Sequence, residues 1–238
     1  MAADDLPGPV VTFLNVIGVP WPYLNEDEVR RFAGMVRQFG QAVETTHQDA
    51  TTAMANFAQA YQGAATRQMQ SGWTKMSAQH TQELVEGCRL LAEALDLAAD
   101  YIVAQKVEAV AELVAMAATF VADQAAAVAT FGLAEAAVPV IIGTGKKLLE
   151  TLKQQIIQHI MGEVIEAAAK PLFAKVEAAM SGLDWSQSGA AGGGSDLGEG
   201  FSIDHGTAGA HLQVLSGHAD TLRGHAQVLR SGMAGLAF

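Results

Sequence analysis

One apolar stripe constrains this chain more than any other feature of its sequence. From residue 29 to residue 64, apolar or small side chains recur in unbroken steps of three and four residues. This spacing places them all on one face of an α-helix, whereas the side chains of a strand repeat every two residues. The stretch therefore predicts one long amphipathic helix, whose stripe consists of Val29, Phe32, Val36, Phe39, Val43, Thr46, Ala50, Ala53, Phe57, Ala60 and Ala64.

Two further stripes predict two more long helices. The second stripe consists of Leu84, Cys88, Leu91, Leu95, Ala98 and Ile102. From Val103 it shifts by one position onto Val107, Val110, Val114, Ala117, Val121, Ala125 and Val128. Such a shift predicts a buried face that rotates along the helix. A third helix is expected after Pro139, Gly143 and Gly145, with one apolar face formed by Leu149, Leu152, Ile156, Ile160 and Val164. Pro171 should kink or end this helix, and a last turn or two should reach Met180.

The chain is expected to reverse between the first two stripes, at the segment formed by Tyr61, Gln62 and Gly63. Glycine takes a positive φ at low cost, so Gly63 is the predicted turning point. Met69 and Trp73 follow it as large apolar side chains. The predicted fold class is all-α: an elongated antiparallel helical bundle built on a long αα-hairpin, with a tethered C-terminal helix.

Composition excludes several functions. Half of the residues are hydrophobic, but only 6% are aromatic, which suits close-packed helices. A formal net charge of −11 argues against a nucleic-acid partner. The single cysteine excludes an intrachain disulfide framework and a cysteine-based zinc site. No uncharged apolar run approaches the roughly 20 residues of a membrane span, and Asp4 and Asp5 stand where a signal peptide is basic.

The predicted organisation has four parts. Residues 1–25 form an acidic arm whose prolines, Pro7 and Pro9 among them, should keep most of it out of regular helix. Residues 26–180 form the helical bundle. Residues 181–203 are a linker rich in glycine and serine, and residues 204–238 form an amphipathic helix.

The arm leads into a compact motif formed by Pro20, Trp21 and Pro22, followed by the acids Glu26, Asp27 and Glu28. Asn25 is the predicted N-cap of the first long helix, and acids near a helix N-terminus favour its positive end. Capping explains every acid of the motif, and Trp21 is expected to pack the arm onto the bundle.

The C-terminal helix has its own apolar stripe, which includes Leu212, Leu215, Leu222 and Leu229. We expect these leucines to bind a partner helix, in this chain or in another, unless the helix opens a second hairpin. Histidines recur every seven residues, at His211, His218 and His225. Two helical turns separate neighbours by roughly 10 Å, too far for one metal ion. They are interpreted as a solvated shoulder beside the stripe, with a weak pH sensor as the alternative.

No catalytic constellation is found. His47 with Asp49, and His159 with Glu163, are helix neighbours that are interpreted as polar surface groups. No metal-binding or nucleophile motif is present, so neither an enzyme nor a cofactor or metal site is predicted.

The motifs resemble a known family. An aromatic residue at Tyr61, Gly63 two residues later and Met69 beyond it resemble the turn of the WXG100 family of secreted helical hairpins, with Tyr61 in the family's tryptophan position. The segment from Gly18 to Glu28 and the sequence Ala104-Gln-Lys-Val-Glu108 resemble the N-terminal helical domains of actinobacterial toxins exported by type VII secretion, as does the short sequence Thr130-Phe-Gly132.

This resemblance implies a non-enzymatic trafficking and assembly module. It implies hetero-oligomers with small WXG100-type helical proteins and contact with the export machinery, and it leaves a homo-oligomer open. The chain would be cytoplasmic before export and then secreted or held at the cell surface without a signal peptide. A channel or pore component and a plain structural bundle are the alternative functions.

The family's usual export signal is a tyrosine followed four residues later by an acid, after the second helix. Here Tyr101 is followed by Gln105 at that spacing, and Tyr23 with Asp27 fits the spacing only within the capping segment. The sequence therefore predicts that a partner supplies the signal.

Overall fold

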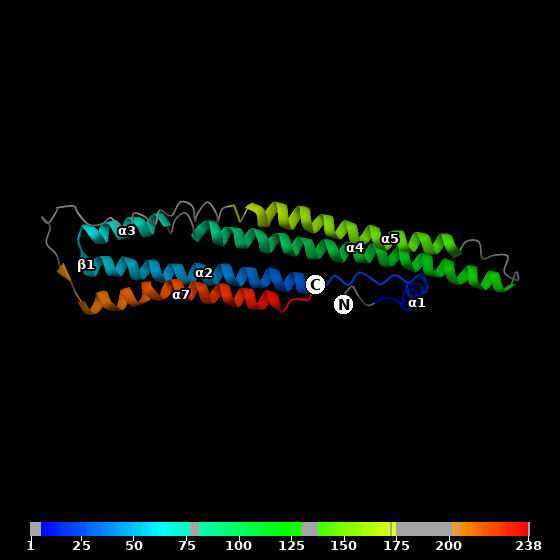
Figure 1. Ribbon diagram of the computed structural model, residues 1–238, viewed down its shortest axis with the longest axis horizontal. Coiled ribbons are helices and arrows are strands. Elements are labelled where there is room, and N and C mark those ends of the chain that lie inside the picture. The colour runs from blue at the N-terminus through cyan, green and yellow to red at the C-terminus, as the bar shows by residue number, and fades with distance from the viewer. Residues whose placement is uncertain are drawn as a thin grey trace. The chain divides into compact units, whose positions relative to one another are not determined.

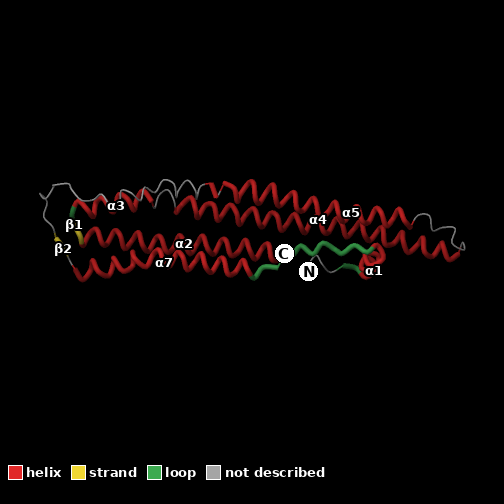
Figure 2. Tube along the Cα trace, in the orientation of Figure 1, coloured by secondary structure: helices red, strands yellow, loops and turns green. Residues whose placement is uncertain are grey.

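The protein is an all-α bundle, as the sequence predicts. The structure is a computed structural model that describes residues 6–76, 81–129, 138–171, 173–174, 202–203 and 205–237. Figures 1 and 2 show that nearly all of these residues are helical. The helices are α1 (Gly8–Ile17), α2 (Glu26–Ala60), α3 (Ala64–Met76), α4 (Gln82–Ala129), α5 (Val138–His159), the π-helical segment η3 (Ile160–Ala169) and α7 (His205–Ala234). The short strands β1 (Tyr61–Gln62) and β2 (Ser202–Ile203) pair with each other.

The chain groups into two compact units, and both are discontinuous in sequence. The arm unit comprises Met1–Arg31, Ala94–Ile165 and Ala237–Phe238, and the hairpin unit comprises Phe32–Glu93 and Glu166–Leu236. Both α2 and α4 contribute residues to each unit. The linear division at residues 25, 180 and 203 stays a prediction, and most of the predicted linker lies outside the described residues.

In the arm unit, residues 8–17 form a helix where an irregular arm was expected. Pro9 lies in the first turn of α1, where a backbone N–H has no partner within the helix, so proline is tolerated there. Gly18 ends α1 in the left-handed conformation, with φ of 68°, and its N–H donates to the carbonyl of Leu14. The helix is stabilised by its buried face, which consists of Val10, Phe13, Leu14 and Ile17.

This face of α1 packs against α4 and α5. The rings of Phe13 and Phe120 lie 5.7 Å apart between centroids. A β-carbon added to Gly145 of α5 would lie 3.2 Å from the Phe13 ring and 3.4 Å from Ile17. Gly145 was expected to precede the third helix, but it lies within α5 and allows α1 to approach that helix closely.

The buried face of α4 does not shift at Val103, and this prediction is wrong. Burial continues in steps of three and four residues through Ala99, Ile102, Lys106, Ala109, Leu113 and Ala117. The valines of the shifted stripe lie outside this face, with Val107 60% and Val121 61% exposed. The reason is Lys106: a lysine interrupts an apolar stripe in the sequence, but here its side chain is fully buried.

Within the arm unit, α2 and α4 run antiparallel. Glu26 pairs with Lys106 at 2.8 Å, and one turn further along α2 the guanidinium of Arg30 pairs with Asp100 at 2.8 Å. As the residue number rises along α2, the number of the partner residue on α4 falls, which is the pattern of an antiparallel pair. The hairpin predicted from the two stripes is confirmed at this end.

In the hairpin unit, α2 has several neighbours. Trp73 of α3 reaches back to Thr51 of α2, and Gly40 of α2 lies against Cys88 of α4. The helix α7 runs beside α2, where Gly232 lies against Met35 (Figure 1). These neighbours bury a further column of α2, beside the predicted stripe, that consists of Ala33, Gly40, His47 and Met54.

The third predicted helix is confirmed as α5 with η3. Leu149, Leu152, Ile156 and Val164 are buried on one face. The predicted extension to Met180 lies outside the described residues. In the part of the chain that the structure describes, no helix combines the length and the apolar character needed to cross a bilayer.

The close approach at Gly145 makes the first testable prediction. Gly145→Leu should lower the free energy of unfolding by about 1–3 kcal/mol, because the added side chain must displace Phe13. The control is Gly143→Leu, since a β-carbon there meets no atom within 4 Å. This control should be neutral or slightly stabilising, because leucine favours helix over glycine. Equal stability of the two variants in chemical denaturation would contradict the packing of α1 on α5.

Candidate functional site

The chain reversal lies where the sequence predicts it, but glycine conformation does not drive it. The helix α2 ends at Ala60, and α3 begins at Ala64. Between them, Tyr61 stacks on Phe57 with ring centroids 5.1 Å apart and an angle of 12°. The backbone of Tyr61 and Gln62 pairs antiparallel with Ile203 and Ser202.

The expected positive φ at Gly63 is wrong. Among the described residues, Gly18 is the glycine with positive φ. A β-carbon at Gly63 would meet no atom within 4 Å, so the predicted strain of Gly63→Val has no basis in the structure. The extended pair at β1 turns the chain, and the carbonyl of Gly63 accepts a hydrogen bond from the N–H of Arg67 at the start of α3.

Trp73 is the centre of an aromatic and histidine cluster. Its indole ring stacks on the His47 ring of α2 at 5.1 Å between centroids and 8° between planes. His218 of α7 meets Trp73 edge-on at 5.5 Å and His47 at 5.8 Å. The indole N–H of Trp73 donates to Thr51 Oγ1 at 3.0 Å. We call Trp73, His47 and His218 the Trp–His cluster; it joins three helices of the hairpin unit.

Burial sets the electrostatics of the Trp–His cluster. Burial lowers the pKa of His47, and the neighbouring His218 lowers it further. Burial also lowers the pKa of His218. Two sequence interpretations are therefore corrected: His47 is buried rather than a surface group, and His218 packs against aromatic rings instead of lying on a solvated shoulder.

The other predicted residues of this region lie at its edges. Met69 of α3 is 38% exposed. On α7, Leu215, Leu222 and Leu229 are half-buried, and the side chain of Leu212 lies outside the described residues. His225 of α7 shares a hydrogen bond of 2.8 Å with Thr46. The tail helix therefore packs on α2 of its own chain.

The N-terminal motif forms a second cluster, in the arm unit. Trp21 is 3% exposed, Pro22 is half-buried and Pro20 is exposed. The predicted cap is confirmed: Asn25 Oδ1 accepts from the N–H groups of Asp27 and Glu28. The exposed side chain of Asp27 lies 3.5 Å from Arg30, and the half-buried side chain of Glu28 lies 3.5 Å from Arg31.

Glu26 differs from the other two acids. Its side chain is 5% exposed and binds the ammonium of Lys106 at 2.8 Å. The same ammonium donates to the carbonyl of Leu24 at 2.6 Å. Capping alone does not account for this acid, so that interpretation is corrected. The contact holds the segment before α2 against the middle of α4.

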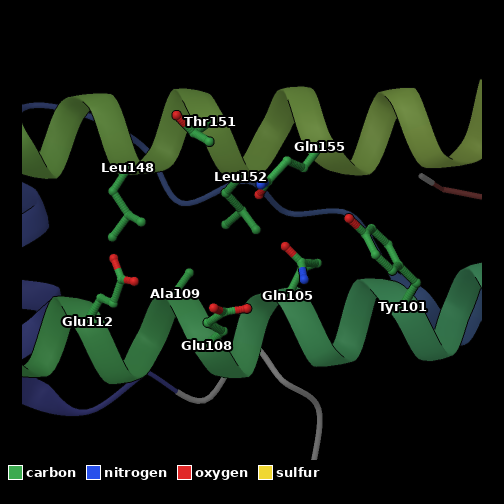
Figure 3. Close-up of a pocket in the computed structure, with 9 residues that line it drawn as sticks. All are labelled: Tyr101, Gln105, Glu108, Ala109, Glu112, Leu148, Thr151, Leu152 and Gln155. Atoms are coloured by element: carbon green, nitrogen blue, oxygen red, sulfur yellow. The ribbon is translucent and has the colours of Figure 1, made fainter.

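A polar groove runs between α4 and α5 in the arm unit (Figure 3). It has a volume of about 260 Å³. Glu112 of α4 points toward Leu148 of α5, Gln105 faces Gln155, and Glu108 lines the α4 side. Tyr101 closes one end and stacks on His159 at 3.8 Å between centroids. The groove lining contains two carboxylates and no basic side chain.

Neither cluster has the chemistry of a catalytic centre. Within the described residues, no group of three metal-ligating side chains lies together. Burial raises the pKa of the Cys88 thiol, which disfavours the reactive thiolate. The interactions that define both clusters join helices.

Comparison with known families agrees with this geometry. The sequence model of the WXG100 like domain matches residues 3–144, and the chain belongs to this family. It is a type VII secretion-related helical protein. Proteins of this family typically form helical hetero-oligomers with the secretion machinery, and the family is not known as enzymatic. Neither the curated proteins nor the solved structures gave a match.

Sequence reasoning missed three features of these sites. It did not place Lys106 against Glu26. A lysine within an apolar stripe needs an acidic partner, and the acids at the start of the first long helix are candidates for that partner. It did not bring His47 and His218 together, because nothing in either helix's periodicity identifies its neighbour. It did not find the helix α1, because prolines dominated the interpretation of the arm.

Proposed function

We propose that this chain is the N-terminal trafficking and assembly module of a toxin-type protein exported by type VII secretion. Its work is to bind small WXG100-type helical proteins and to present the assembly to the export machinery. Membership of the WXG100 like family over residues 3–144 is the observation that carries this proposal. The helical hairpin, with clusters that join helices rather than enclose a substrate, supports it.

A surface for such a partner is available on α4. Val107, Val114 and Val121 follow one another at intervals of seven residues and are 60%, 43% and 61% exposed. We call these three residues the α4 valine face. Alanines at the same interval, Ala104, Ala111, Ala118 and Ala125, are exposed beside it. A heptad of small apolar side chains lets a second helix approach closely, as in a coiled coil.

The groove between α4 and α5 lies on a different side of α4 from the valine face and has a charge preference of its own. Glu108 and Glu112 line the groove, and neither forms an ion pair within the described residues. A lysine or arginine of a partner helix that enters the groove meets two carboxylates. A partner acid at the same place is repelled, so the groove favours basic partner residues.

Binding of the α4 valine face is tested with the small WXG100-type proteins encoded near this chain. The variant is the double substitution Val114→Asp and Val121→Asp, and its affinity is measured by calorimetry. Affinity should fall by at least about tenfold, since an aspartate buried in an apolar interface loses its hydration. Val140→Asp is the matched control, because Val140 is a valine of α5 that is 67% exposed and lies off this face. Unchanged affinity of the double variant would remove the valine face from the proposal.

Export is the second test. Tyr101 lies stacked on His159 and is followed by Gln105, so the family's usual signal is missing there. Tyr23 is 69% exposed, but it precedes α2 rather than following the second helix. We therefore expect the chain to remain in the cytoplasm of a strain that lacks all small WXG100-type proteins, and to be exported when they are restored. Secretion from the deletion strain, measured by immunoblotting of the culture medium, would show that the signal is not supplied in trans.

A further inference from the structure

We propose that α7 is a pH-released cover: protonation of His47 and His218 separates α7 from α2 and α3 at mildly acid pH and exposes the α2 face beneath it. This inference goes beyond the proposed function and does not depend on it. It concerns contacts within the hairpin unit alone.

The attachment of α7 is shallow. Every described side chain of this helix is half-buried or exposed, whereas α2 has fully buried stripe residues such as Val36, Val43 and Phe57. Among the described residues, its contacts with α2 include those of His218 with His47, His225 with Thr46, and Gly232 with Met35. Two of these three contacts are made by histidines. The contact between His218 and His47 depends on the protonation state of the two rings.

The geometry around His218 disfavours a positive charge. The ring lies edge-on to both Trp73 and His47. Its Nε2 atom is buried, and no group of the described residues hydrogen-bonds with it. Protonation would bury a charge without a hydrogen-bond partner at Nε2. If His47 is protonated as well, two positive rings lie 5.8 Å apart.

The charged groups nearby do not offset this. Asp49 of α2 lines the same hollow as His218, and its attraction favours protonated His218. It is exposed to solvent, so the attraction is screened. On α7, Asp220 is bound to Arg223 at 2.6 Å.

The direction of the pH effect follows from the two histidines. Both have folded-state pKa values below their ordinary value of 6.5. The docked state therefore binds fewer protons than the released state. Docking is fully favoured above the ordinary pKa and weakens as the pH falls through it, until both states are protonated below the folded-state pKa.

Hydrogen exchange on the full chain tests the proposal. Amide protection is compared at about pH 7.5 and about pH 5, a range that spans histidine titration, after correction for intrinsic exchange rates. Protection of residues 205–234 should be lost at the lower pH, because the released state binds more protons than the docked state. Protection of α5, in the other unit, should not change with it.

Variants assign the effect to the Trp–His cluster. The double variant His47→Phe and His218→Phe keeps aromatic rings but cannot titrate, so α7 should stay protected at acid pH. His211→Phe is the matched control, since His211 lies on the same helix outside the cluster, and it should respond as the wild type does. Circular dichroism checks folding, and the single variant His218→Phe decides in the same way if the double variant is unfolded. Protection of α7 that is independent of pH in the wild type, or a wild-type response in the non-titrating variant, would overturn the proposal.

Discussion

The structure of the arm unit depends on one buried charge. The Lys106 side chain has no exposed surface, and its ammonium lies between the Glu26 carboxylate and the Leu24 carbonyl. Removing an ammonium from water costs several kcal/mol unless charge and hydrogen bonds replace its hydration. Those replacements come from the segment just before α2 and from its first residue. The chain can bury Lys106 only when this segment lies against α4, so the ion pair selects that arrangement.

The same pair determines which side of α4 remains free. Lys106 lies on the buried face of α4. The valines that follow this face by one residue in the sequence therefore point outward, as the exposure of Val107 and Val121 shows. A lysine at an exposed position would have allowed the valines to turn inward. One ion pair therefore connects the packing of the arm with the surface that we propose for partner binding.

The sequence predicted the helices well where apolar spacing is regular. The stripe from Val29, the third-helix face from Leu149, and the Asn25 cap are all confirmed by the structure. The spacing of apolar residues identifies the apolar face of a helix, and a capping residue such as Asn25 identifies where a helix begins. Both are short-range properties, so one sequence is enough to show them. The family resemblance rests on similarly local motifs, and the family match confirms it.

Features that depend on contacts between distant segments were not predicted. An apolar periodicity assigns a lysine to the solvent-facing side of a helix. The predicted stripe of α4 therefore shifts at Val103, and the pairing of Lys106 with Glu26 is not predicted. The prolines of the arm predicted that the residues of α1 are irregular. However, Pro9 lies in the first turn, where a helix tolerates proline, and buried side chains such as Phe13 stabilise the rest of the helix. His47 and His218 meet only because α7 packs beside α2. In each case the deciding energy comes from a tertiary neighbour.

A double-mutant cycle on Glu26 and Lys106 measures how strongly the two buried charges depend on each other. The free energy of unfolding is measured for Lys106→Met, for Glu26→Leu and for both together. Each single substitution leaves one charge buried without its partner, and should cost about 3–5 kcal/mol. The double substitution replaces the pair by apolar side chains and should recover most of that loss, since such replacements are often neutral. Single costs below about 1 kcal/mol that simply add in the double variant would be typical of exposed pairs, and would contradict the account.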